Sequence, residues 1–86
     1  MYYTYILYST SINKYYIGYT QDLKLRLERH NSSWGKFSSR GIPWKLVYAE
    51  EHLEKSEAIK RENEIKRKKS RKYIEALISH AGGHPA

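Results

Sequence analysis

A glutamate stands where a predicted helix should present apolar side chains. In KSEAIKRENEIKRKK, Glu62 lies four residues after Ala58 and three before Ile65, which places it on the inward face. A carboxylate there must be paired, bound to a cation or reached by a cleft, because burying an unpaired charge is costly. Mg²⁺ and Mn²⁺ prefer carboxylate ligands. The simpler alternative, which the pattern alone favours, is a salt bridge to Lys66 or Lys69.

An arginine and a histidine raise the same question on an earlier predicted helix. Arg26 and His30 share one face with Leu23 and Leu27, at spacings of three and four residues. A guanidinium fork suits phosphate oxygens. For either residue alone, a snorkelling arginine or a half-buried histidine is the alternative. Their recurrence on one face, beside a pair of tyrosines, favours a site.

Tyrosines crowd the beginning of the chain, most visibly in KYYIGYT, residues 14–20. Each one separately is typical of strand packing. In any register that keeps them on one face, Tyr5 and Tyr16 lie close together across a predicted hairpin. A phenol with a pKa of about 10 is a poor base at neutral pH, and it becomes useful only beside a cation. Any chemistry of these two tyrosines therefore depends on Arg26 and Glu62.

The elements that must position these residues can be predicted from pattern. Residues 2–8 and 14–19 are rich in aromatic and β-branched residues and predict two strands of a hairpin. Thr20 and Asp22 are suitable caps for a helix that ends near His30. The remaining prediction is a loop over 31–42, a strand over 43–50, a helix over 54–69 and a further helix over 70–78, separate or continuous. This order predicts an α+β fold with a small, three-stranded, largely antiparallel sheet flanked by helices.

Composition limits the class of protein. With 86 residues the chain has room for one domain, which we expect over 1–80, followed by a flexible tail over 81–86. Cysteine is absent, no apolar run reaches a membrane span, and no signal peptide is evident, so a cytoplasmic protein is expected. Sixteen Lys and Arg against nine Asp and Glu give a net charge of +7. Such a surface attracts polyanions, chiefly nucleic acid.

Basic residues cluster in two places. A dense run covers residues 60–72, and the loop around Trp34 and Phe37 combines rings with cations. Phosphate-backbone contact and base stacking are the functional interpretations, and a solvated helix face and an ordinary anchored loop are the alternatives. The candidate nucleic-acid contacts are Lys14, Lys36, Arg40, Arg61, Lys66 and Lys69.

Together these residues resemble a known family. Tyr3-Thr4-Tyr5, then ten residues, then Tyr16-Ile17-Gly18 looks like the paired GIY and YIG motifs of the GIY-YIG endonucleases, also called URI-domain proteins. The segments 22–31 and 58–69 fit the following motif blocks, and the chain looks most similar to the small stand-alone bacterial members. Two departures stand out. Tyr3 replaces the first glycine, and residues 70–86 lack the late asparagine of larger members.

The resemblance implies a DNA endonuclease or nickase that depends on one Mg²⁺ or Mn²⁺ ion and acts in DNA repair or recombination. It implies catalytic roles for Tyr5, Tyr16, Arg26 and His30, with Glu62 as the metal ligand. Water would be the nucleophile and Tyr5 the base or its assistant. The main alternative is a nucleic-acid-binding module with the same fold and little cleavage. A protein-interaction domain, suggested only by aromatics such as Trp34, is a third reading.

Overall fold

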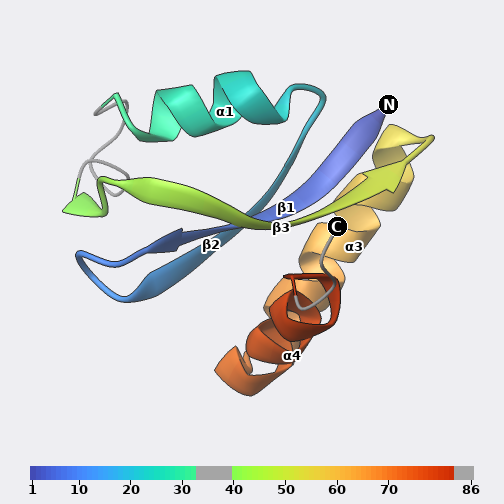
Figure 1. Ribbon diagram of the computed structural model, residues 1–86. Helices are drawn as coiled ribbons and strands as arrows, with labels where there is room; N and C mark the ends of the chain where they lie inside the picture. The colour runs from blue at the N-terminus through green and yellow to red at the C-terminus, as the bar shows by residue number, and fades with distance from the viewer. Residues whose placement is uncertain (33–39, 83–86) are drawn as a thin grey trace.

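The computed structural model describes residues 1–32 and 40–82. Within them the chain forms β1 (Tyr2–Ser9), β2 (Lys14–Thr20), α1 (Leu23–His30), β3 (Trp44–His52), α3 (Lys55–Lys68) and α4 (Arg71–Gly82). The sheet has the order β2-β1-β3, and both pairings are antiparallel (Figure 1). The predicted α+β class and the predicted order of strands and helices are confirmed.

The central strand β1 is buried on both faces, as its run of apolar residues predicts. On one face Tyr5 and Leu7 pack with Trp44 and with apolar residues of α1. On the other, Ile6 packs with Ile65 of α3 and with α4. Figure 1 shows α1 on one side of the sheet and α3 and α4 on the other. The period-two alternation of a strand thus divides the core into two halves.

Local polar contacts fix where the helices begin and end. The Asp22 carboxylate accepts from the backbone N–H of Leu25 at 3.0 Å and caps α1. Lys69 adopts a left-handed conformation, with φ 47°, which ends α3. The Ser70 hydroxyl accepts from the backbone N–H of Tyr73 at 3.1 Å at the start of α4. The last two helices are therefore separate.

Element ends differ slightly from the predicted ones. β3 continues to His52, beyond the predicted end at residue 50, because it pairs with the whole of β1. α4 reaches Gly82, two residues past the expected end of the domain. The loop predicted over 31–42 and the tail predicted over 81–86 lie partly outside the described residues. Trp34, Lys36 and Phe37 lie wholly outside them.

Candidate active site

Two tyrosines from neighbouring strands face α1 together. Tyr5 is paired with Gly18 across the hairpin, and Tyr16 is two residues earlier on the same face of β2. The two rings stack with centroids 6.3 Å apart and an interplanar angle of 27°. The predicted proximity of Tyr5 and Tyr16 is confirmed, while Tyr15 and Ile17 pack against the opposite half of the core.

Gly18 creates the space for this pair. A Cβ at this position would lie 2.7 Å from the Tyr5 hydroxyl oxygen and 3.2 Å from Cε1 of Tyr16. Both distances are closer than side chains tolerate without moving. A glycine near the end of a strand can admit backbone or substrate, and here the Tyr5 ring fills that space.

The Tyr5 hydroxyl is buried and its proton is held tightly. The residue is 1% exposed, and no hydrogen-bond partner for its oxygen lies among the described residues. Burial, with smaller contributions from Tyr16 and Glu62, raises the pKa of Tyr5 to about 12 against the opposing positive charge of Arg26. Arg26 is near enough to favour the phenolate through its charge and its side-chain donors, although no contact to the oxygen among the described residues has the geometry of a hydrogen bond. The phenol is therefore neutral at pH 7 and needs added positive charge to ionise.

His30 lies against Tyr16 at the C-terminal end of α1. It is 7% exposed, and its ring centroid is 4.5 Å from that of Tyr16 and 5.9 Å from that of Trp44. Its Nδ1 lies 3.1 Å from the carbonyl oxygen of Arg26. Burial lowers the pKa of His30 below 6.5, so the ring is neutral at pH 7. Because a carbonyl only accepts, Nδ1 carries the proton and Nε2 is the acceptor nitrogen.

Trp44 forms one wall of this site, and the sequence did not predict this role. Its ring lies edge-on to both Tyr16 and His30. The Asn31 side chain anchors it by accepting from the Trp44 backbone N–H at 2.6 Å and donating to its carbonyl at 3.1 Å. An asparagine directly after a helix and a tryptophan directly after a proline were the available signals. Neither reveals their pairing across thirteen residues.

Glu62 lies on the inward face of α3, as its spacing from Ala58 and Ile65 predicts, and it forms an ion pair with Lys66. Its side chain is 14% exposed, between the buried Ala58 and Ile65. One carboxylate oxygen accepts from Nζ of Lys66 at 2.6 Å. The salt bridge offered as the simpler alternative is thus present. Glu62 is also close enough to Tyr5 to affect its pKa, which links α3 to the tyrosine pair.

A metal at Glu62 would receive few ligands from the protein. Among the described residues, no group of three His, Cys, Asp or Glu side chains could hold an ion. Mg²⁺ is commonly bound through one or two carboxylates, with water and substrate phosphates completing its shell. A single half-buried carboxylate fits that mode of binding and does not fit a permanently held structural ion.

The predicted nucleic-acid contacts fall into different surroundings. Lys14, Lys66 and Lys69 line one groove between β2 and the junction of α3 and α4. Arg40 is exposed, and Lys36 lies outside the described residues. Among the described residues, three of the predicted contacts therefore share one groove.

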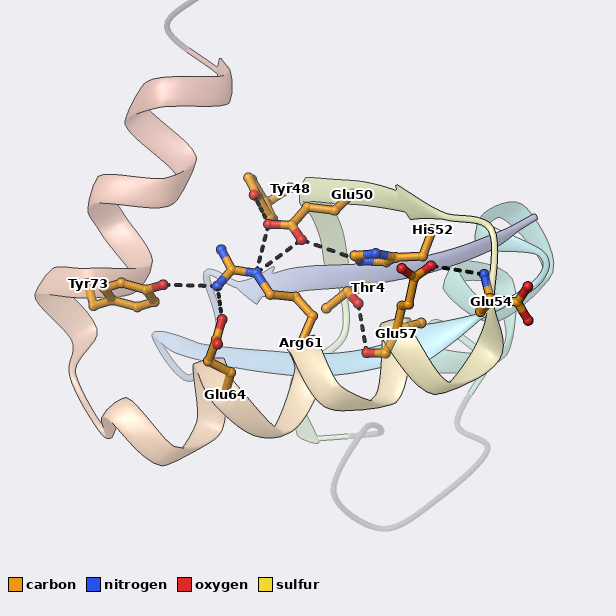
Figure 2. A network of polar contacts seen from close by, with 10 residues as sticks. Thr4, Tyr48, Glu50, His52, Glu54, Glu57, Arg61, Glu64 and Tyr73 are labelled. Carbon is orange, nitrogen blue, oxygen red and sulfur yellow. Dashed lines mark hydrogen bonds and ion pairs between the residues drawn. The ribbon is translucent and has the colours of Figure 1, made fainter.

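Arg61 is engaged inside the protein. Figure 2 shows its guanidinium among side chains of β3, α3 and α4. Its Nε donates to both carboxylate oxygens of Glu50 at 3.0 Å, and its Nη1 donates to Glu64 and to the Tyr73 hydroxyl. Burial disfavours the charge, but these hydrogen bonds raise the pKa of Arg61 above its usual value. With Nε and Nη1 engaged in this way, Arg61 is a structural tie between three elements.

The fold, the tyrosine pair and the motif residues together define the family. The GIY-YIG catalytic domain model matches residues 1–74, and this chain belongs to that family. Within the family it is similar to small proteins known as UPF0213. One, from Streptococcus pneumoniae serotype 4, is 48% identical over 56 residues, which cover 64% of this chain and 57% of the relative. Another, from Staphylococcus aureus strain Mu3, is 48% identical over 52 residues, 59% of this chain and 63% of the relative.

A solved structure has the same fold. The solution NMR structure of the UPF0213 protein BH0048 from Bacillus halodurans is 38% identical, with a TM-score of 0.61 over 96% of this chain and 88% of that one. The matches to the two curated relatives span about three-fifths of their length. Among the described helices, none has the length and apolar character needed to cross a bilayer.

Proposed function

We propose that this protein is a divalent-metal-dependent DNA endonuclease or nickase that hydrolyses phosphodiester bonds. The proposal rests on one observation, the convergence of Tyr5, Tyr16 and His30 on a single sheet face beside Arg26, with Glu62 coupled to Tyr5. Phosphodiester hydrolysis needs a proton acceptor, positive charge at the phosphate and a ligand for a cation. This set of side chains offers all three.

Glu62 would hold one Mg²⁺ or Mn²⁺ ion, whose chemistry is to stabilise negative charge on the phosphate and on the departing oxygen. Binding requires that the carboxylate exchange its contact with Lys66. The amine released in this way would remain beside the substrate backbone as a countercharge.

Arg26 would stabilise developing negative charge, and Tyr5 would act as the proton acceptor. Arg26 stabilises the extra negative charge on the non-bridging oxygens as a water oxygen bonds to phosphorus. Tyr5 would first lose its own proton to solvent, and as a phenolate it would then accept the proton of that water, while the sugar oxygen leaves and is protonated by solvent. The pKa of Tyr5, about 12, must fall for this to happen. Arg26 already acts in that direction, and substrate-bound positive charge would add to it.

Tyr16 and His30 would hold the geometry. Tyr16 is fixed between the Tyr5 and His30 rings. His30, neutral with Nε2 as its acceptor, can take a hydrogen bond from the attacking water or carry a proton away. Because His30 Nδ1 donates to the Arg26 carbonyl oxygen, a movement of the Arg26 backbone would also move the imidazole.

The second candidate is a DNA-binding module with little cleavage. It is favoured by the Glu62–Lys66 ion pair, which occupies the proposed ligand, and by the lack of asparagine in residues 70–86. The setting for either activity would be cytoplasmic DNA repair or recombination, on branched or damaged DNA and in company with a protein partner that selects the substrate.

A cleavage panel separates the two candidates. We expect the wild-type protein to cut at least one of branched, flapped, nicked and plain duplex DNA with Mg²⁺ or Mn²⁺, and none with EDTA. Arg26→Ala should lower the rate by about 100-fold or more, since it removes charge stabilisation from the reacting phosphate. If the wild type binds DNA yet cuts none of these with either metal, the binding module is the correct account.

A further inference from the structure

One stripe of α3 carries a carboxylate between two lysines. Lys55, Glu62 and Lys66 are separated by seven and four residues, which brings them to the same side of a helix. The rise per residue places Lys55 about 10 Å before Glu62 and Lys66 about 6 Å after it along the axis. Both lysines are exposed, whereas Glu62 is largely buried. The candidate metal ligand thus has a cation on each side.

A pocket of about 460 Å³ lies at the Lys55 end of this stripe. Lys55 lines this pocket together with Arg26 and Arg29 of α1 and with Tyr19 at the end of β2. Asp22 also lines the pocket, but its carboxylate is used in capping α1. Three cations against one engaged acid make this pocket attractive to an anion.

A groove of about 480 Å³ lies at the other end, where β2 begins. Its cations are Lys14, Lys66, Lys69 and Arg71. Among the described residues that line it, none is acidic. The two hollows therefore sit at opposite ends of β2: Tyr15 and Ile17 line the second hollow and precede Gly18, whereas Tyr19 and Thr20 line the first and follow it. β2 is an edge strand, because none of the strands in residues 1–32 and 40–82 pairs with its outer side.

We propose that one strand of DNA lies along β2 and α3, with its scissile phosphate at Glu62 and flanking phosphates in both hollows. Arg29 and Lys55 would hold the backbone on one side of the scissile bond, and Lys14 and Lys69 would hold it on the other. β2 has 7 residues and spans about 20 Å. That length corresponds to roughly six nucleotide steps of a duplex strand. The placement of the scissile phosphate rests on the proposed function; the two phosphate subsites do not.

Salt-dependent binding tests the path without any cleavage. Affinity for a fluorescent duplex of about 20 base pairs is measured by anisotropy in EDTA over a range of salt concentrations. Each lost phosphate contact should reduce the slope of log affinity against log salt by about 0.9. We expect Arg29→Gln with Lys55→Gln to reduce it by about 1.8, Lys14→Gln with Lys69→Gln by a similar amount, and the four together by about 3.6.

The matched control is Lys45→Gln with Lys60→Gln, which removes two exposed cations that line neither hollow. It should leave the slope nearly unchanged. The charge-keeping pair Arg29→Lys and Lys55→Arg should restore the wild-type slope, which separates loss of charge from loss of folding. The path is wrong if the Arg29 and Lys55 pair of variants changes the slope no more than the control pair does.

Failure of this path and failure of the proposed function give different results. If the wild type cuts DNA but neither pair of variants reduces the slope of log affinity against log salt, the proposed function holds and the proposed DNA path is wrong. If the wild type cuts nothing but both pairs of variants reduce that slope, the DNA path holds and the proposed function is wrong.

Discussion

At the scale of single residues, the site contains a buried polar atom, the Tyr5 hydroxyl oxygen, for which no stabilising hydrogen bond is present among the described residues. The Tyr5 hydroxyl is buried beside Gly18, and no partner for it lies among the described residues. A buried hydroxyl without a hydrogen bond lowers the free energy of unfolding relative to an apolar group of the same shape. Such an atom is typical of a site in which folding stability has been exchanged for function.

Tyr5→Phe therefore separates stability from activity. We expect its free energy of unfolding in urea to be unchanged or about 1 kcal/mol higher than that of the wild type, because no hydrogen bond is lost. DNA cleavage by the same variant should fall by about 100-fold or more, because the proton acceptor is gone. A loss of stability of more than about 1 kcal/mol would show that the hydroxyl is bonded in solution.

His30 predicts a specific dependence of stability on pH. Burial holds its pKa below 6.5, so between that lowered value and 6.5 the unfolded chain binds a proton that the folded chain does not. The free energy of unfolding should fall as the pH drops through 6.5 and should level off below the folded pKa. Urea unfolding at about pH 7.5 and 5.5 measures the fall, and His30→Gln should reduce it. An NMR titration of the ring with a midpoint above 6.5 would contradict this account.

At the scale of elements, Arg61 ties three of them together. Its guanidinium joins Glu50 of β3, Glu64 of α3 and Tyr73 of α4 (Figure 2). Since Arg61 is the residue before Glu62, this tie also fixes the rotation of α3 about its axis. The orientation of the candidate metal ligand is therefore set from a neighbouring face of the helix, about 100° away around its axis.

Arg61→Gln should lower the free energy of unfolding by about 2 kcal/mol, because it leaves the partly buried Glu50 carboxylate without its guanidinium partner. Urea denaturation gives the value. Glu64→Gln, which changes the more exposed partner, serves as the control and should cost less. Equal stability of Arg61→Gln and wild type would mean that the network does not hold these elements together.

The elements also show how much of the fold and of the site can be predicted from sequence. Helix starts were predictable where a side chain caps them, as Asp22 and Ser70 do, because capping is local. The inward position of Glu62 was predictable from helix periodicity. The Trp44 wall and the Arg61 tie were not, because both join residues that only the tertiary fold brings together.

At the scale of the whole molecule, the described chain has one sheet and one candidate site. A single site of this size can act on one strand of a duplex in each visit. The net charge of +7 favours encounter with DNA but carries no information on sequence preference.

Supercoiled plasmid DNA tests this expectation. Nicked circles should accumulate before linear molecules, and the initial rate should rise in proportion to protein concentration. Simultaneous appearance of linear product with a second-order dependence on protein would show instead that two copies act together.

The most direct measurement of the central claim is the single-turnover cleavage rate of Glu62→Gln in Mg²⁺, compared with wild type and with Glu75→Gln. Glu75 is a matched control, because it also forms an i,i+4 ion pair, with Arg71, but does so on α4 instead of α3. We predict that Glu62→Gln loses cleavage by about 100-fold or more while it keeps DNA binding in EDTA, and that Glu75→Gln cuts at the wild-type rate. Cleavage by Glu62→Gln at the wild-type rate would contradict the assignment of Glu62 as the metal ligand, and with it the proposed mechanism.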